Sequence, residues 1–300
     1  MAQERVVYLN GEMVPESGAK ISVRDLGFVF GDAVFDVTRT FGGTIFRLEE
    51  HLERLYDSLA YLRIDPGMTR ERMAGLTMQV LEANLPLLGE NDDYWVAQRV
   101  TRGVPAESGP VPTVIIECMP LPFAERAAYY RDGLPLITPS VRRTPPQCMS
   151  PRVKMHNYIN LVLGELEVQS QNPKAWPILL DMNGNLCEGK GSNIFIVKNE
   201  RVTTPREQYV LAGISRQTVI KLARNLGIEV AETDIDLFDA YTAEEVFLTS
   251  TSFCICPVSS INGSVVGAGK VPGPVTGRLQ KAYNDLVGID IVEQYLARLT

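Results

Sequence analysis

Two hairpin signals and a leucine-striped helix dominate the first part of the chain. Asn10-Gly11 separates two short apolar runs, and Asn-Gly readily adopts the positive φ angles of a type I′ hairpin turn. Gly42-Gly43 lies in the same way between the strand-like runs 34–41 and 44–46. The leucines that follow recur at three- and four-residue steps, the spacing of one helix face: Leu48, Leu52, Leu55, Leu59 and Leu62. This mixture of strands and helices predicts an α/β or α+β fold.

A break in the apolar pattern predicts two domains. A helix is predicted over 70–84 and strands over 94–101 and 113–118, before Pro120, Pro122 and the polar, aromatic stretch 125–133 interrupt the apolar pattern. Linkers collect such residues, so we expect a small domain over 1–120, a linker over 121–133 and a large domain over 134–300. The periodicity of the second domain predicts helices over 157–170, 215–226 and 275–287, and strands over 178–181, 193–197 and 246–248.

Charge and composition exclude several classes of function. The formal net charge of the 300 residues is -7, which opposes binding to nucleic acid, because that needs clustered Lys and Arg. No run of eighteen apolar residues occurs, and the first residues lack an apolar signal core, so we expect no membrane span and a cytoplasmic location. Five cysteines and two histidines match no zinc template, and no metal site is expected. The sequence also lacks the G-x-G-x-x-G and P-loop signatures of nucleotide-binding proteins.

Lys154 is the first candidate for chemistry. It stands in the segment 152–158, directly before a predicted apolar helix. An isolated lysine is most often a solvated surface residue, but a cation at a helix start is electrostatically disfavoured. A lysine kept in such a place is suited to be the nucleophile of a Schiff base.

Glu188 is the second candidate. It lies in the glycine-rich turn 186–193, which leads into the apolar strand 194–197. Loop carboxylates and turn glycines need no function to explain them. A carboxylate beside a pyridinium nitrogen, however, keeps that nitrogen protonated and makes the ring an electron sink.

Three further features offer donors to an anion. Gly213-Ile214-Ser215 opens a predicted helix, whose free N–H groups and dipole attract a negative group, although Gly-Ser before a helix is also an ordinary N-cap. Arg54 lies off the leucine stripe of its helix, and a guanidinium can bind a phosphate through two hydrogen bonds. The turn Thr249-Ser250-Thr251-Ser252 follows a predicted strand and offers hydroxyl donors to phosphate or carboxylate oxygens, although a polar turn is the simpler interpretation.

Together these features resemble the fold-type IV pyridoxal-phosphate aminotransferases, which include branched-chain, D-amino acid and (R)-amine transaminases and aminodeoxychorismate lyase. The matching segments span nearly the whole chain: Asp25-Leu26-Gly27-Phe28, Phe30-Gly31-Asp32, the helix of Arg54, Lys154 with Asn157-Tyr158, Glu188-Gly189 with Ser192-Asn193, Gly213-Ile214-Ser215-Arg216 and Gly273-Pro274-Val275-Thr276. The resemblance implies a small N-terminal α/β domain, a larger C-terminal domain with a barrel-like sheet, and pyridoxal 5′-phosphate as cofactor. It also implies a homodimer or a dimer of dimers, in which a loop of the neighbouring subunit helps to close the substrate pocket.

The same resemblance implies roles for single residues. Lys154 would hold the cofactor as an internal aldimine and move the proton between the substrate carbon and C4′ of the cofactor. Glu188 would pair with the pyridine nitrogen, Tyr158 would contact the phenolic oxygen, and Leu211 would pack on the ring. The remaining cofactor-binding positions that the family implies are Arg54, Ser192, Asn193, Gly213, Ile214, Ser215, Ser250 and Thr251.

The substrate-facing positions that the family implies are Phe30, Phe35, Val37, Trp95, Ala97, Thr251 and Ser252. Branched-chain enzymes usually carry glycine where this chain has Val37, and the Arg-x-His clamp of D-amino acid enzymes is missing after Thr101-Arg102-Gly103. Candidates for a mobile carboxylate partner are Arg39, Arg99 and Arg126. The aromatic residues predict an apolar cavity, which favours an (R)-amine-type transaminase.

The expected reaction is a ping-pong transamination. An amine donor converts pyridoxal phosphate to pyridoxamine phosphate, and a keto acid such as pyruvate restores it. Branched-chain L-amino acid transamination is the second hypothesis, followed by D-amino acid transamination and aminodeoxychorismate lyase activity. A catalytically silent cofactor-binding relative is the non-enzymatic alternative, and the presence of both Lys154 and Glu188 argues against it.

Overall fold

The structure is a computed structural model that describes residues 4–299. The chain separates into two compact units. The first unit runs to Leu121 and also includes Val153–Asn157, and the second comprises Pro122–Arg152 and the chain from Tyr158 onward.

The first unit is built on a six-stranded antiparallel sheet in the order β2-β1-β6-β5-β3-β4. Both predicted hairpins are confirmed, because Asn10, Gly11, Gly42 and Gly43 all have positive φ angles at the two turns. The bounds of the strands are β1 Val6–Leu9, β2 Glu12–Pro15, β3 Ala33–Phe41, β4 Thr44–Ile45, β5 Tyr94–Val104 and β6 Val111–Pro120.

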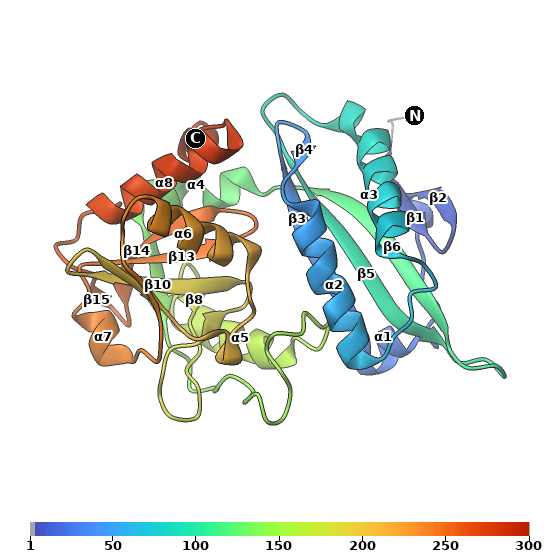
Figure 1. Cartoon of the computed structure of the whole chain (residues 1–300), viewed down its shortest axis with the longest axis horizontal. Coiled ribbons are helices and arrows are strands. Elements are labelled where there is room, and N and C mark those ends of the chain that lie inside the picture. The colour runs from blue at the N-terminus through green and yellow to red at the C-terminus, as the bar shows by residue number, and fades with distance from the viewer. Residues whose placement is uncertain (1–3, 300) are drawn as a thin grey trace. The chain divides into compact units, whose positions relative to one another are not determined.

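Helices α2 (Leu48–Leu62) and α3 (Arg70–Asn84) cover one face of this sheet (Figure 1). The leucine stripe is confirmed as the core-facing side of α2, since Leu52, Leu55 and Leu59 are buried. Burial of these side chains removes apolar surface from water and holds the helix on the sheet. The short helix α1 (Leu26–Phe30) and the 3-10 turns η1 (Glu16–Gly18) and η2 (Leu85–Leu87) complete the unit.

The segment Val153–Asn157 lies along the first residues of β3. Phe35 N donates to Lys154 O at 2.9 Å, and His156 N donates to Ala33 O at 2.8 Å. Met155 forms an antiparallel bridge with Val34 between these two bonds. Lys154 therefore belongs to the first unit, although the sequence pattern places it in the predicted domain 134–300.

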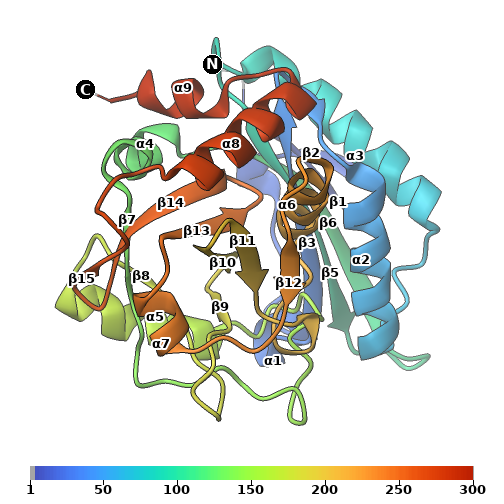
Figure 2. The same ribbon diagram turned by 60° about the vertical axis from the view of Figure 1, so that its left-hand side comes forward.

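The second unit contains a nine-stranded mixed sheet, whose main path is β12-β11-β10-β13-β14-β7-β8, with β15 beside β14 and β9 beside β10. In Figure 2 the strands β10, β13 and β14 lie next to one another at its centre. The bounds of the strands are β7 Leu134–Ile137, β8 Trp176–Pro177, β9 Glu188–Gly189, β10 Ser192–Lys198, β11 Arg201–Thr204, β12 Val230–Glu232, β13 Glu245–Ser250, β14 Cys254–Ile261 and β15 Ser264–Val265.

The helices of the second unit confirm the three predicted ones to within about two residues: α5 Ile159–Gln171, α6 Ile214–Asn225 and α8 Pro274–Val287. The others are α4 Phe123–Asp132, α7 Leu237–Tyr241 and α9 Ile291–Leu296, together with the 3-10 turn η3 Glu207–Tyr209. Within residues 4–299, no helix combines the length and the apolar character that a membrane span requires.

The segment 121–133, predicted as a linker, instead forms α4 and packs into the second unit. Its buried residues, Phe123, Ala127 and Tyr130, recur at helical spacing, but charged residues lie between the first two and directly after the third. Tyr130 stacks on Tyr295 of α9 with ring centroids 4.6 Å apart. The apolar face of α4 is narrow, so the sequence reads as polar although the helix is firmly packed.

A buried carboxylate caps the start of α8. Glu245 of β13 accepts hydrogen bonds from Val275 N at 2.8 Å and Thr276 N at 2.7 Å. These N–H groups have no partner within the helix, and a negative charge at this end also interacts favourably with the helix dipole.

We expect Glu245→Ala to lower the free energy of unfolding by about 2 kcal/mol, because two buried N–H groups lose a charged acceptor. The measurement is urea unfolding monitored by circular dichroism. The neighbouring exposed Glu244, whose carboxylate accepts one bond from Asn199 N, provides the control, and Glu244→Ala should change the stability by less than about 0.5 kcal/mol. Equal midpoints for the two variants would contradict the capping role.

Candidate active site

The predicted site residues fall into two groups, one in each unit. The first unit carries Lys154, Arg54, Phe30, Phe35, Val37, Trp95 and Ala97. The second unit carries Tyr158, Glu188, Ser192, Asn193, Leu211, Gly213, Ile214, Ser215, Ser250, Thr251 and Ser252. Each group has its own local geometry.

Lys154 is held at its backbone and lies against an aromatic ring. Its carbonyl accepts from Phe35 N at 2.9 Å, and its N–H donates to Ser58 Oγ of α2 at 3.2 Å. The ammonium nitrogen Nζ is 4.4 Å from the centroid of the Phe35 ring, within the range of a cation–π contact. Because its backbone is fixed and its side chain is partly buried, the amine of Lys154 is held in a restricted position, as a group that must react at one particular atom requires.

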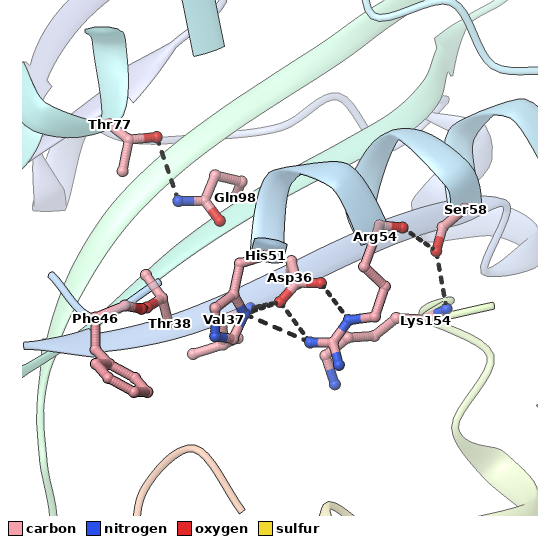
Figure 3. Close-up of polar contacts among 10 residues, drawn as sticks. All are labelled: Asp36, Val37, Thr38, Phe46, His51, Arg54, Ser58, Thr77, Gln98 and Lys154. Carbon is pink, nitrogen blue, oxygen red and sulfur yellow. Dashed lines mark hydrogen bonds and ion pairs between the residues drawn. The ribbon is translucent and has the colours of Figure 1, made fainter. Parts of the chain in front are cut away.

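Arg54 binds a buried carboxylate of β3 (Figure 3). Its Nε donates to Asp36 Oδ2 and its Nη2 donates to Asp36 Oδ1, each at 2.8 Å. His51 Nδ1 lies 2.7 Å from the same Oδ1. The side chain of Asp36 is fully buried, so this cluster fixes the plane of the Arg54 guanidinium.

The ionisation of the cluster follows from its geometry. Burial by itself raises the pKa of Asp36. The charge of Arg54 and the hydrogen bonds from Arg54 and His51 outweigh this effect and hold the pKa of Asp36 well below its usual range. Burial lowers the pKa of His51 despite the neighbouring carboxylate. At neutral pH the cluster therefore consists of a carboxylate, a guanidinium and an uncharged imidazole.

The opposite face of β3 carries the predicted substrate-facing residues. Successive side chains of a strand point to opposite faces, so Phe35 and Val37 lie on the other side from Asp36. On β5, Ala97 stands directly across from Val37, and Arg99 stands across from Phe35. The extra bulk of Val37 thus lies next to a small, fully buried alanine.

The other substrate candidates of the first unit are less enclosed. Trp95 of β5 is half-buried and stands opposite Arg39 in the strand pairing. Phe30, the last residue of α1, has 71% of its surface exposed. Phe30 is therefore largely open and does not by itself define one face of a pocket.

The three arginines considered for a carboxylate differ in their surroundings. Arg39 is buried and pairs with Asp93 at 3.3 Å, a contact that serves the core of the first unit. Arg99 pairs with Glu117 of β6 at 2.7 Å. Arg126 of α4 donates to Ser252 Oγ, and burial lowers the pKa of its guanidinium. Arg99 and Arg126 remain the candidates.

Glu188 in the second unit is a buried carboxylate whose two oxygens both accept hydrogen bonds. Arg143 Nε donates to Oε1 at 2.9 Å, and Leu211 N donates to Oε2 at 2.8 Å. Leu211 O accepts from Asn193 Nδ2 at 2.9 Å. A carboxylate fixed in this way can present a negative oxygen to a ring N–H group without rearranging.

The first backbone N–H groups of α6 are hydrogen-bond donors that no side chain caps. Gly213 is the N-cap residue and makes no capping bond, and the first turn contains no acidic residue. Asn193 Oδ1 lies so close to Gly213 that an added Cβ would meet it at 2.2 Å, which explains the glycine. Uncapped N–H groups at the start of a twelve-residue helix suit a phosphate.

A hydroxyl cluster lies beside this helix start. Ser215 Oγ donates to Ser250 O at 3.0 Å, and Ser250 Oγ is 3.0 Å from Ser252 Oγ. Thr251 lies between these serines in the turn after β13. Among residues 4–299, the buried Ser192 Oγ and Thr249 Oγ1 have no hydrogen-bond partner. The donor set therefore fits an oxyanion ligand.

Several partners of the predicted residues escaped the sequence patterns. These partners act through contacts between residues distant in the chain: Asp36 and His51 around Arg54, Ser58 beside Lys154, and Arg143 beside Glu188. The sequence signals for these partners were weak: Asp36 is an acidic residue within the strand-like run 34–41, and His51 precedes Arg54 by one helical turn.

Comparison with known proteins identifies the family. The model of the class IV amino-transferases matches residues 33–261. A putative branched-chain-amino-acid aminotransferase of Methanocaldococcus jannaschii is 40% identical over 287 residues, covering 93% of this chain and 96% of that protein.

Two solved structures show the same fold. The branched-chain amino acid aminotransferase of Escherichia coli has a TM-score of 0.84 at 30% identity and covers 95% of both chains. The branched-chain amino acid aminotransferase of Thermoproteus uzoniensis, solved with norvaline, has a TM-score of 0.84 at 28% identity and covers 99% of both chains. The predicted resemblance and fold class are confirmed, and the chain belongs to the class IV aminotransferase family.

Proposed function

We propose that this aminotransferase transfers the amino group of branched-chain L-amino acids to a keto acid. The observation that carries the proposal is the 40% identity with the Methanocaldococcus jannaschii protein over nearly the full length of both chains. The second hypothesis from the sequence is therefore better supported than the (R)-amine preference.

Class IV aminotransferases use pyridoxal 5′-phosphate, and one solved branched-chain relative is complexed with N-(5′-phosphopyridoxyl)-L-glutamate. When bound, the cofactor ring withdraws electrons from the α-carbon of the substrate. We assign to Lys154 the covalent attachment and the proton at that carbon, and to Glu188 the pyridine N–H group. Arg54, the start of α6 and the hydroxyl cluster with Thr251 supply donors to the phosphate, Tyr158 contacts the phenolic oxygen and Leu211 packs on the ring.

Local geometry supports these assignments. The backbone bonds of Lys154 hold its amine beside Phe35, and the bonds from Arg143 and Leu211 fix the carboxylate of Glu188. The uncapped N–H groups of α6 provide an anion site that no acidic side chain in its first turn occupies.

The argument for an (R)-amine substrate depended in part on Val37, and the strand pairing weakens that part. Val37 stands directly across from Ala97, so a larger residue on β3 is matched by a small one on β5. Because the residue directly opposite is small, it offsets part of the bulk of the valine, and Val37 is compatible with a branched aliphatic side chain in the substrate.

The substrate class is tested by the half-reaction without keto acid. Purified holoenzyme is mixed separately with L-leucine, D-alanine, (R)-1-phenylethylamine and its (S) enantiomer, and the visible absorbance of the bound cofactor is followed. We expect L-leucine to bleach it at least about tenfold faster than the other three compounds, since one well-fitted side chain contributes roughly that much discrimination. Faster bleaching by the (R)-amine would reinstate the first hypothesis.

The role of Lys154 is tested by Lys154→Ala, which we expect to abolish turnover and covalent attachment, because no other amine takes its place. Borohydride reduction followed by mass spectrometry of the wild type should locate the cofactor on Lys154. The exposed Lys174 is the control, and Lys174→Ala should keep full activity. Wild-type rates in Lys154→Ala would refute the assignment.

We also propose a homodimer. Large apolar side chains are exposed on two helices, Phe28 and Phe30 on α1 and Ile159, Leu163 and Leu166 on α5, and exposed apolar surface of this kind marks association sites. Light scattering after size exclusion should give twice the mass of 33.2 kDa or four times this mass. A monomer at micromolar concentration would contradict the proposal.

A further inference from the structure

A closed ring of hydrogen bonds joins β3, α2 and the Lys154 segment. Figure 3 shows the bonds among Asp36, Arg54, Ser58 and Lys154. Phe35 N donates to Lys154 O, and Lys154 N donates to Ser58 Oγ. Ser58 Oγ donates to Arg54 O at 2.9 Å, and the guanidinium of Arg54 binds Asp36, the chain neighbour of Phe35. We call these five residues the Asp36–Ser58 ring.

Two members of the ring are buried and are not proposed to touch the cofactor themselves. Asp36 has 0% and Ser58 2% of its surface exposed, so water does not compete for their hydrogen bonds. The two bonds from Arg54 to Asp36 fix both the position and the plane of the guanidinium. The hydroxyl of Ser58 donates one hydrogen bond and accepts another at the same time. This fixes the position of the Lys154 backbone along the axis of α2.

The charges in and beside the ring show that Asp36 orients the guanidinium of Arg54 rather than attracting an anionic ligand. The carboxylate of Asp36 compensates the charge of Arg54, and His51 is uncharged because burial lowers its pKa. Asp36 therefore adds no attraction for an anion. Its contribution is to keep the guanidinium in one rotamer, so that binding a ligand does not have to order it.

We propose that Asp36 and Ser58 are positioning residues that hold Arg54 and Lys154 in a fixed arrangement for the phosphate and the aldehyde of the cofactor. The inference rests on the proposed function, in which Arg54 would bind the phosphate and Lys154 would hold the cofactor covalently at its aldehyde carbon. Asp36 acts on the phosphate end through Arg54. Ser58 acts on the aldehyde end through the backbone of Lys154.

Three ligands separate the two ends. Pyridoxamine 5′-phosphate has the phosphate but no aldehyde, pyridoxal has the aldehyde but no phosphate, and pyridoxal 5′-phosphate has both. Dissociation constants of all three are measured by absorbance and fluorescence titration of the full chain freed of cofactor. The variants are Asp36→Asn, Asp36→Glu and Ser58→Ala.

We expect opposite selectivity from the two positions. Asp36→Asn should weaken binding of pyridoxamine 5′-phosphate about tenfold and leave pyridoxal within about twofold, because a misplaced guanidinium affects only the phosphate. Asp36→Glu, which keeps the charge but displaces the carboxylate, should act in the same direction. Ser58→Ala should weaken pyridoxal about tenfold and leave pyridoxamine 5′-phosphate within about twofold.

Thr77 of α3 provides a matched control. Like Ser58 it is buried, donates to the carbonyl four residues earlier and accepts one further bond, from Gln98 Nε2, but it lies outside the ring. Thr77→Val should leave the affinity for all three ligands unchanged. A loss equal to that of Ser58→Ala would show that any weakened core of this unit has the same effect, and would overturn the proposal.

Two reference variants separate failure of this inference from failure of the proposed function. Arg54→Met should weaken pyridoxamine 5′-phosphate, and Lys154→Ala should prevent covalent capture of pyridoxal. If either reference variant binds like wild type, the proposed function fails at that residue. If both behave as expected while the Asp36 and Ser58 variants bind like wild type, or bind the phosphate ligand more tightly, the positioning roles are wrong.

Discussion

The antiparallel contact between Val153–Asn157 and the beginning of β3 determines the geometry on which the candidate site of the first unit depends. Its two backbone bonds join residues that are far apart in the chain. They also fix which side chains of the segment point to the same side. Lys154 and His156 therefore flank the Phe35 ring, while Met155 between them is buried. A shift by one residue would exchange these orientations and would remove the amine from its aromatic neighbour.

Successive side chains of β3 point to opposite faces of the sheet, so neighbouring residues have different roles. Asp36 points to the helix-covered face, where it binds Arg54 and His51. Phe35 and Val37 point to the other face, where Ala97 and Arg99 of β5 are their partners. Anchoring of the arginine and shaping of the substrate-facing surface therefore occur within three consecutive residues, and a change in one task need not disturb the other.

Local sequence signals predicted the elements whose causes are local. The Asn10-Gly11 turn, the leucine stripe of α2 and the span of α3 depend on residues within a few positions of one another. The linker prediction for 121–133 was wrong because α4 buries a narrow apolar face against α9, a partner at the far end of the chain. The partners Asp36, Ser58 and Arg143 were missed for the same reason.

The sequence by itself determined the order of the elements, the resemblance to the family and the identity of Lys154, Glu188 and Arg54 as candidates, because each is encoded by residue type and spacing along the chain. Only the tertiary structure decided that the Lys154 segment pairs with β3, that Arg54 is oriented by Asp36, and that Val37 faces Ala97. These features depend on strand register and on contacts across long sequence separations, and no periodicity of the chain encodes which strand a distant segment will join.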